Sequence, residues 1–343
     1  MHAALLDALS HLGAGRFLRA RKSAELALVQ ERSLSLSADP PPHAAQLVAL
    51  AHLLVAESAQ ALQDKVSRES HLQSALAMSS AALGGQATLE GAQLRAARWA
   101  LDDREPQQAL NLLAELPMGV ARRTVALRIK LKAARLAGQS GQALETARLL
   151  VKHRAFSTDA ARVLVRGLAI EFINKAYDSG QVQRVWASLS QAEQEMPELA
   201  VQAAQRLLDL GGAGELARDW LLPVWERMAS DPTAFAESFG DPWRVKLVRA
   251  IEATMDTLDA PWLVRLETLQ QKHPRLAEMQ YLVGMACMKR QLWGKAQQLM
   301  LQASHGLQDA GLLRSAWKTL AVLAQQRGDA QAALDAWQHA AQG

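Results

Sequence analysis

The amino-acid sequence predicts an all-α protein, and three observations lead to this fold class. Half of the 343 residues are hydrophobic, and most of these are Ala and Leu, which favour helices. Val, Ile, Tyr and Phe, which favour strands, are less frequent. Small residues recur at helical spacing, and Ala109 and Ala143 hold the same position in two units 34 residues apart. Together these observations predict a right-handed superhelical solenoid of helical hairpins, in which each hairpin contacts only its neighbours.

The clearest pattern lies near the end of the chain, in residues 279–341. One helical stripe has residues at i, i+3, i+4 and i+7, namely Trp317, Leu320, Ala321 and Ala324. After a turn at Gly328-Asp329, a second stripe follows with Ala333, Trp337 and Ala340. The same spacing occurs one unit earlier, at Val283, Gly284, Cys287, Ala296, Met300 and Ala303. Small residues let two antiparallel helices approach closely, and this order of small and aromatic residues is typical of the tetratricopeptide (TPR) repeat.

The first part of the chain follows the same plan less regularly. Residues 4–28 are predicted to form two short helices around Gly13-Ala14-Gly15, with packing positions in the second helix at Ala20, Ala24 and Ala27. The Ser- and Pro-rich residues 33–42 are predicted to form a loop, because consecutive prolines cannot continue a helix. A second pair is expected at 43–62 and 69–82, with Arg68 where a small residue is expected.

The middle of the chain goes from regular to degenerate. Residues 94–101 are predicted to pair with 107–116, and 125–137 with 141–151, with Gly138 at the turn. Helices with a blurred period are expected at 158–180, 181–196, 199–210 and 215–228, then a loop with a short helix at 231–241, and helices at 243–258 and 262–272. The prediction is about seven or eight hairpins. They form one continuous solenoid, with N-terminal repeats in 1–156, degenerate repeats in 157–273 and C-terminal repeats in 274–343.

The composition restricts the class of protein. A formal net charge of +4 and a pI near 9.3 favour acidic partners but are too small to indicate nucleic acid. A single cysteine, Cys287, excludes an intrachain disulfide and every CxxC site. We expect no membrane span, because the most apolar run, residues 44–62, is interrupted by polar residues including His52 and Glu57. The first residues also lack the basic region and cleavage site of a signal peptide.

Four stretches resemble one family, the HemY-type TPR proteins associated with haem biosynthesis in Gram-negative bacteria. They are ALLDALSHLGAGRFLRARKSAELAL (4–28), HLLVAESAQALQD (52–64), LKAARLAGQSGQALETARLLVKH (131–153) and YLVGMACMKRQLWGKAQQLMLQAS (281–304). In that family an N-terminal membrane anchor precedes a cytoplasm-facing TPR region. Because this sequence lacks the anchor, it resembles the soluble portion. The resemblance implies a scaffold for late haem-biosynthetic enzymes at the cytoplasmic face of the inner membrane, with no catalytic residues to carry over. A flavin-dependent protoporphyrinogen oxidase shares the HemY name, but it would need a GxGxxG turn between a strand and a helix, which this sequence lacks.

Basic residues recur at the repeat period on the helices that a TPR array presents to its groove. Arg98, Lys132 and Arg166 are each 34 residues apart, as are Arg128 and Arg162, and Arg95 and Arg135 lie one helical turn from members of this set. We predict that these seven residues form a cationic ladder that receives an acidic peptide, an acidic protein surface or porphyrin propionates, because guanidinium groups bind carboxylates through two hydrogen bonds. The alternative is that they are ordinary solvated charges, since the chain has 38 Lys and Arg residues.

Other candidate sites are weaker. The sequence contains no GxSxG, Walker lysine loop or HExxH, so it predicts neither an enzyme nor a metal site. Haem ligation would need an axial His or Cys beside an apolar pocket, whereas the histidines are scattered singly, at His11, His52, His71, His153, His273, His305 and His339. Cys287 stands at a helix-packing position and is predicted to be buried. The tryptophans, including Trp186, Trp220, Trp225, Trp243 and Trp262, fit either a recognition patch or irregular core, and their helical spacing favours core.

The sequence therefore predicts a non-catalytic TPR scaffold that binds protein partners and needs no cofactor. The resemblance adds haem-biosynthetic enzymes as partners, and an inner-membrane location for a protein that carries the anchor. Two alternatives remain open: a porphyrin- or haem-carrying protein that uses the basic groove residues for propionates, and a general TPR assembly factor for cell-envelope complexes.

Overall fold

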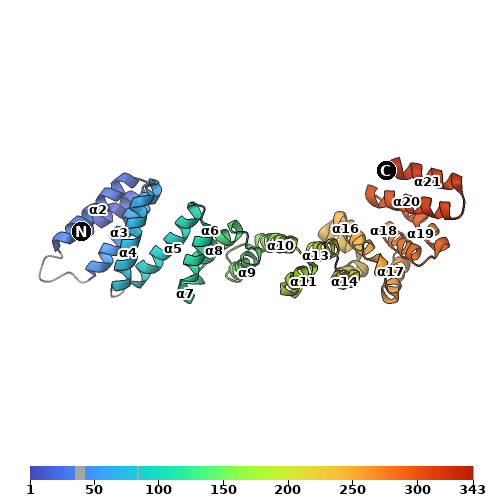
Figure 1. Ribbon diagram of the computed structural model, residues 1–343, viewed down its shortest axis with the longest axis horizontal. Helices are drawn as coiled ribbons and strands as arrows, with labels where there is room; N and C mark the ends of the chain where they lie inside the picture. The colour runs from blue at the N-terminus through green and yellow to red at the C-terminus, as the bar shows by residue number, and fades with distance from the viewer. Residues whose placement is uncertain (35–42, 83–84, 343) are drawn as a thin grey trace. The chain divides into compact units, whose positions relative to one another are not determined.

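The computed structural model describes residues 1–34, 43–82 and 85–342, and over these ranges the protein consists of helices and turns without a strand (Figure 1). The all-α class is therefore confirmed. The chain divides into two compact units, Met1–Val165 and Arg166–Gly343, and the boundary falls inside helix α10 (Thr158–Asn174). The division of the solenoid into three parts, at 156 and 273, stays a prediction.

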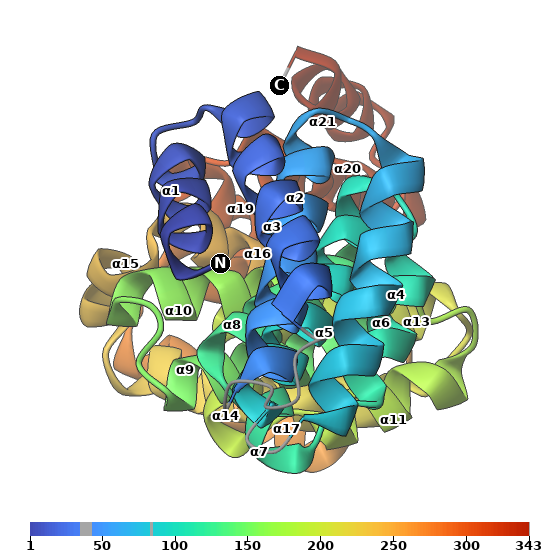
Figure 2. The ribbon, with the colours of Figure 1, turned by 90° about the vertical axis from the view of Figure 1, so that its left-hand side faces the viewer.

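The first unit is built of antiparallel helix pairs. The pairs are α1/α2, α3/α4, α5/α6 and α8/α9, and the first helices α1, α3, α5 and α8 pack on one another in series. Figure 2 shows α2, α3 and α4 side by side. The helices are α1 (His2–Gly13), α2 (Phe17–Leu34), α3 (Ala44–Ala61), α4 (Lys65–Ala81), α5 (Gln86–Asp102), α6 (Pro106–Ala114), α7 (Met118–Ala121), α8 (Thr124–Leu136) and α9 (Ser140–Lys152).

Alanines lie where the helices of this unit pack most closely. The predicted packing residues Ala20, Ala24 and Ala27 are fully buried, and so are Ala109 and Ala143. Small side chains let the helix backbones approach, so larger residues such as leucine can fill the space on either side. Of the predicted loop at 33–42, residues 33 and 34 end α2 and the rest lies outside the described residues.

The turns inside the pairs share one form. The second residue after the first helix is left-handed at Gly15, Gly138 and Gly328, and also at Gln63, Arg104 and Gln291, with φ between 60° and 77°. The next residue donates its N–H to a carbonyl five residues back, as Gln139 does to Ala134 at 2.8 Å. This is the Schellman ending of a helix, for which glycine is favoured because it lacks a Cβ. The predicted turns at Gly138 and Gly328 are confirmed, and the three non-glycine turns have no comparable sequence signal.

The second unit repeats the arrangement. Its pairs are α13/α14, α18/α19 and α20/α21, helix α17 packs on α18, and α13, α16, α18 and α20 pack in series. The helices are α11 (Ser179–Ser188), α12 (Gln191–Gln194), α13 (Pro197–Asp209), α14 (Gly214–Ser230), α15 (Pro232–Phe239), α16 (Asp241–Glu252), the 3-10 helix η1 (Met255–Thr257), α17 (Ala260–Lys272), α18 (Ala277–Lys289), α19 (Trp293–Gly306), α20 (Ala310–Gln326) and α21 (Ala330–Gln342).

Three segments that the sequence predicts as continuous helices are divided, two of them at side-chain caps. The predicted helix 181–196 breaks before α12, because the Ser190 hydroxyl accepts from the Glu193 N–H while the Glu193 carboxylate accepts from the Ser190 N–H, a complete capping box. The predicted helix 158–180 ends at Asn174, and Asp178 caps α11. The predicted helix 243–258 ends at Glu252 and continues only as η1. The short helix predicted within 231–241 is confirmed as α15.

Helix α3 is long and apolar enough to cross a membrane by length and composition, so the polar residues cited above do not exclude it on those grounds. It is the only such helix among the described residues. However, 50% of its 18-residue window is buried inside the unit, where Leu54 and Val55 belong to the core with α1 and α2. Packing within the repeats therefore accounts for its hydropathy.

Candidate functional site

The seven predicted cations fall into two groups. Six belong to the first unit and Arg166 belongs to the second. Five of the seven are exposed and have no hydrogen-bond or ion-pair partner among the described residues. They are Arg98, Arg128, Lys132, Arg135 and Arg162. Arg95 and Arg166 each form an ion pair with a glutamate.

Helix α8 carries the densest part of the set. Arg128, Lys132 and Arg135 stand at i, i+4 and i+7, so they share one face of the helix. Two exposed apolar side chains flank them, Val125 at 56% and Leu136 at 59% exposure. The opposite face of α8 packs into the unit through Ala126 and Ala133, and Leu127 and Leu131 are buried beside it. We call Arg128, Lys132 and Arg135, together with Arg98 on α5, the α5/α8 cation set.

The two paired members have acidic partners on the neighbouring first helix. Arg95 on α5 pairs with Glu57 on α3, and Arg166 on α10 pairs with Glu198 on α13 at 2.6 Å. The Glu198 carboxylate is only 11% exposed, near the N-terminus of its helix, where a negative charge is favourable. These two arginines therefore connect successive first helices. A pattern of cations alone could not identify their acidic partners, which lie 32 to 38 residues away in the sequence.

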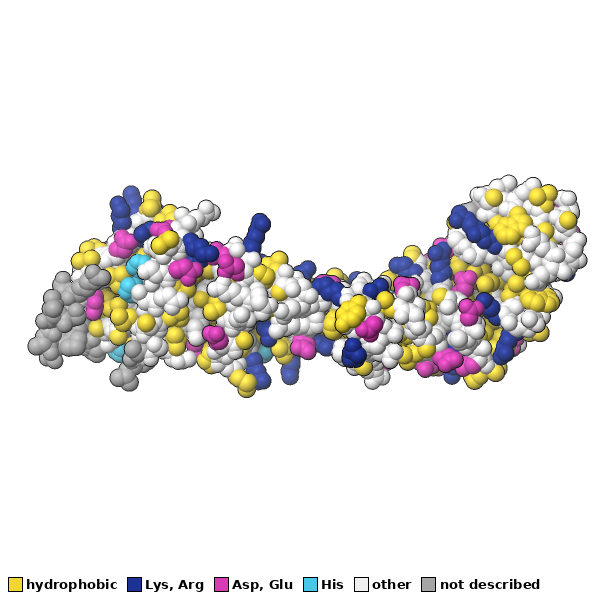
Figure 3. All heavy atoms as spheres, viewed as in Figure 1, with side chains coloured by type: hydrophobic (Ala, Val, Ile, Leu, Met, Phe, Trp, Pro, Cys, Tyr) yellow, Lys and Arg dark blue, Asp and Glu magenta, His cyan; other side chains and the backbone are white. Residues whose placement is uncertain are grey.

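Charges of both signs alternate on the surface. On the face that Figure 3 draws, Lys and Arg side chains lie among Asp and Glu side chains without forming one continuous patch. Positive charge without a nearby acidic residue is therefore confined to small areas of the surface, and the α5/α8 cation set is one of these areas.

Arg68, the residue that breaks the small-residue pattern, is buried at 3% exposure between the second and third pairs. Its guanidinium donates to Gln60, Glu69 and Asp103, the last through both terminal nitrogens at 3.1 and 2.6 Å. It also lies 5.8 Å from the centre of the Trp99 ring. These contacts hold the pKa of Asp103 below its usual value, chiefly through the hydrogen bond from Arg68.

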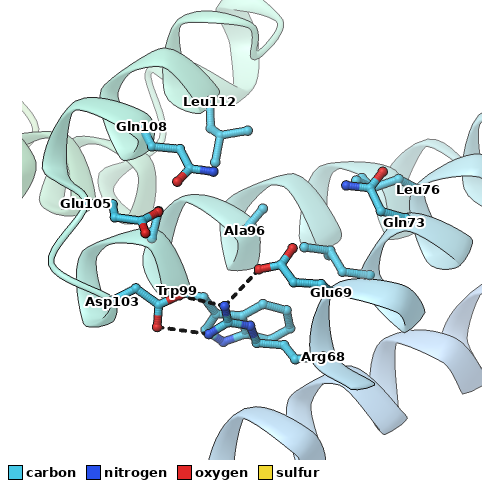
Figure 4. A pocket seen from close by; sticks show the side chains of 12 residues that line it. Arg68, Glu69, Gln73, Leu76, Ala96, Trp99, Asp103, Glu105, Gln108 and Leu112 are labelled. Carbon is cyan, nitrogen blue, oxygen red and sulfur yellow. Dashed lines mark hydrogen bonds and ion pairs between the residues drawn. The ribbon is translucent and has the colours of Figure 1, made fainter. Parts of the chain in front are cut away.

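A cavity of about 80 Å³ lies beside Arg68 (Figure 4). Helices α4 and α6 line its sides, and α5 contributes Ala96, Trp99 and Asp103. The terminal nitrogens of Arg68 are all occupied by protein acceptors, so the guanidinium serves the fold and offers little to a ligand. This explains why Arg68 stands at a position where the repeat pattern predicts a small residue.

Two of the histidines predicted to stand alone lie together. The Nδ1 atoms of His52 on α3 and His71 on α4 are 2.9 Å apart, so the prediction of singly scattered histidines is wrong for these two. The contact requires one protonated and one unprotonated Nδ1. The two residues are 19 positions apart on different helices, beyond the i, i+4 pattern by which histidine pairs are recognised in a sequence. Among the described residues no group of three or more potential metal ligands occurs, so the pair is not completed into a metal site.

The burial of His71 should make the stability of the first unit depend on pH. The pKa of His71 is lowered, chiefly by burial and also by the nearby Arg21. The carboxylates of Glu25 and Asp64 raise it, but by less. Because the unfolded chain binds a proton at a higher pH than the folded chain, stability should be complete above the ordinary histidine pKa and fall as the pH drops through it. We expect the urea midpoint to fall more between pH 7.5 and 5.5 for the wild type than for His71→Gln. The exposed His153→Gln is the control, and equal slopes for all three proteins would contradict the assignment.

Most of the remaining predicted residues lie in the core, whereas Trp243 is half-buried. Cys287 is fully buried, as predicted, and burial raises the pKa of its thiol. Trp186, Trp220, Trp225 and Trp262 are buried, which supports core packing, and the Trp186 and Trp220 rings stack with centroids 5.0 Å apart. Trp337 differs from the prediction, because it remains 37% exposed at the end of the array.

Comparisons with known proteins give only distant structural matches. No family model and no curated protein matches the chain. The crystal structure of the APC/C hetero-tetramer Cut9-Hcn1 aligns at 14% identity over 99% of this chain and 65% of that one, with a TM-score of 0.34. The P58(IPK) TPR domain aligns at 14% identity over 95% of this chain and 98% of that one, with a TM-score of 0.26. The chain thus spans less than two thirds of the first of these, and at such TM-scores neither bears on function. The helix pairs, their Schellman turns and the buried alanines at the repeat spacing make this chain a TPR-like helical-repeat protein.

Proposed function

We propose that this chain is a non-catalytic scaffold that binds an acidic segment of a protein partner on the α5/α8 cation set. The single observation that carries the proposal is the stripe of Arg128, Lys132 and Arg135, which are exposed and have no acidic partner among the described residues. Elsewhere the first helices compensate such charges, as Glu57 does for Arg95 and Glu198 for Arg166. Carboxylates of a partner would complete the same kind of pair across an interface.

Three groups whose pKa values are raised by burial fit a non-catalytic role. A catalytic acid, base or nucleophile is expected in a cleft that a substrate can enter. Here Tyr281 and Cys287, whose pKa values are raised by burial, are fully buried in helix packing. Glu252, whose pKa burial also raises, accepts a hydrogen bond from the Tyr281 hydroxyl at 2.6 Å. The hydrogen bond between Tyr281 and Glu252 joins α18 to α16.

The resemblance to HemY-type proteins supplies the finer part of the proposal. We infer from it that the partners are enzymes of late haem biosynthesis and that the protein acts at the cytoplasmic face of the inner membrane. The sequence stretches quoted above support this part, and the cation set is compatible with it because it would accept any acidic surface. The binding mode and the pathway are therefore tested separately.

A charge-reversal variant tests the binding mode. Arg98→Glu, Arg128→Glu and Lys132→Glu together should reduce capture of partner proteins from bacterial membranes by about tenfold or more, because attraction becomes repulsion. Arg166 is left unchanged, because its replacement would also leave the nearly buried Glu198 unpaired. Capture is measured by quantitative mass spectrometry, and circular dichroism checks that the helix content is retained.

The control changes the same amount of charge elsewhere. Arg122→Glu, Lys152→Glu and Lys318→Glu replace three exposed cations outside the set and should leave capture intact. An equal loss of capture in both triple variants would show that net charge alone causes the effect, and it would reject the binding mode. If the captured proteins include no haem-biosynthetic enzyme, the pathway is rejected and an envelope assembly factor is favoured. Stoichiometric protoporphyrin binding, seen as a Soret shift that the α5/α8 variant abolishes, would favour the porphyrin carrier.

A further inference from the structure

An open apolar groove lies on the second unit, where residues of helices α14 and α17 line it. Its volume is about 380 Å³, which is in the range of ligand and peptide sites. Trp225 and Leu269, both almost fully buried, line it together with Ala229 and Val264. Val264 is 60% exposed although it is apolar, so the groove has an uncovered hydrophobic wall.

Large aromatic residues connect the two helices at this place. The Trp225 and Trp262 rings lie 6.3 Å apart, and both are buried. In the first unit, buried alanines such as Ala109 and Ala143 allow close packing, whereas indole rings keep neighbouring helices further apart. Helix α14 also contains Pro223, which has no N–H to donate to the preceding turn. The groove is therefore a consequence of the irregular part of the repeat pattern.

The charges along the groove are asymmetric. On α17, Arg265, Thr268 and Lys272 stand at i, i+3 and i+7, so the two cations mark one edge of the helix. Seven residues correspond to about 10.5 Å along a helix axis, or about two turns. Neither cation has an ion-pair partner among the described residues, and the Arg265 guanidinium lies 5.6 Å from the centre of the Trp262 ring. Helix α14 contributes the single acidic residue of the lining, Glu226.

We propose that this groove binds an amphipathic helical segment of a partner protein, with apolar residues facing Trp225 and Val264 and carboxylates two turns apart facing Arg265 and Lys272. The apolar lining selects a segment with a hydrophobic face, and the cations on one rim select acidic residues along one edge. Glu226 on the other rim repels carboxylates there, so it fixes which edge of the segment faces α17. This surface is separate from the α5/α8 cation set, because all its residues belong to the second unit.

Calorimetric titration with two synthetic peptides tests the proposal on the full chain. Both peptides have sixteen residues and a leucine face, and one has two glutamates seven residues apart where the other has two lysines. The glutamate peptide should bind the wild type at least about tenfold more tightly than the lysine peptide. In Arg265→Glu/Lys272→Glu the preference should reverse, and Val264→Glu should weaken both peptides by about tenfold.

Exposed positions were chosen so that folding is retained. Lys318→Glu, at an exposed cation of the same unit, is the matched control and should bind both peptides as the wild type does. Absence of binding, equal affinities for the two peptides, or a preference that survives Arg265→Glu/Lys272→Glu would overturn the proposal. Light scattering tests whether a second copy of this chain occupies the groove. A wild-type dimer that the double variant converts to a monomer would also overturn the proposal.

Discussion

Replacing Arg218 by methionine is expected to lower the free energy of unfolding of the second unit by about 3 kcal/mol. Arg218 on α14 is 1% exposed, and its guanidinium donates to the Thr254 carbonyl at 2.6 Å, to the Thr257 hydroxyl at 2.9 Å and to the Thr257 carbonyl. Burial lowers the pKa of Arg218, and no carboxylate is hydrogen-bonded to it among the described residues. Methionine keeps the apolar stem but leaves the Thr257 carbonyl without its donor and the Thr254 carbonyl with only the long contacts of 3.4 Å from Thr257. Each unsatisfied buried group costs about 1–3 kcal/mol.

Hydrogen exchange measured by mass spectrometry localises this effect. Peptides from α14, α16 and η1 should lose protection in Arg218→Met, because the guanidinium joins α14 to the turn after α16. Arg218→Lys keeps the charge but not the planar fork, so it should fall between the wild type and Arg218→Met. If Arg218→Met keeps wild-type protection in these helices, the arginine does not have this role.

Replacing Arg68 by methionine is expected to lower the free energy of unfolding of the first unit by about 2 kcal/mol. The side chain of Arg68 is 4% exposed, so its removal leaves the Gln60 side-chain oxygen without its donor and Asp103 with only Lys65, at 3.2 Å, in a partly buried place. The effect is smaller than for a fully buried ion pair, because Asp103 is 21% and Glu69 50% exposed and water replaces part of the interaction. Urea unfolding measures the change. The fluorescence of Trp99, which Arg68→Met retains, reports on the unfolding of the first unit.

The same variant should change the response to acid. Arg68 lowers the pKa of Asp103 in the folded chain, so its stabilisation is present above the unfolded pKa and is lost as the pH falls through the folded pKa. Arg68→Met should therefore lose less stability on acidification than the wild type. A double-mutant cycle with Asp103→Asn isolates the pair, and additive effects would show that Arg68 and Asp103 are not coupled.

The sequence predicts the helix pairs well, because the alanines buried between helices recur at a regular interval in the sequence. Ala109 and Ala143 are both fully buried, and the turn at Gly138 is left-handed as expected for glycine. The turn at Arg104 has the same φ region without the residue that signals it. The Ser190 capping box was readable as a Ser-x-x-Glu pattern, but helical periodicity on both sides concealed the break.

The candidate site was predictable only in part, because spacing shows which cations share a face but not which acids meet them. Arg128 and Lys132 are exposed on one stripe, whereas Arg95 already pairs with Glu57. The partner acid lies on another helix, so its position depends on how two pairs pack. The contact of His52 with His71 depends on packing in the same way. The α5/α8 cation set therefore stays a prediction for the binding experiments.

The uniform turns within the pairs have a consequence for how such a chain diversifies. Three residues join the two helices in most pairs, as at 62–64, 103–105, 137–139, 290–292 and 327–329, whether the left-handed residue is glycine, glutamine or arginine. A connection of constant length and form cannot vary the geometry of its own hairpin. Differences between hairpins must then come from the side chains where one hairpin meets the next, such as Arg68 in the first unit and Trp225 in the second. New binding surfaces can thus arise in this chain through single substitutions at those junctions, without insertions or altered loops.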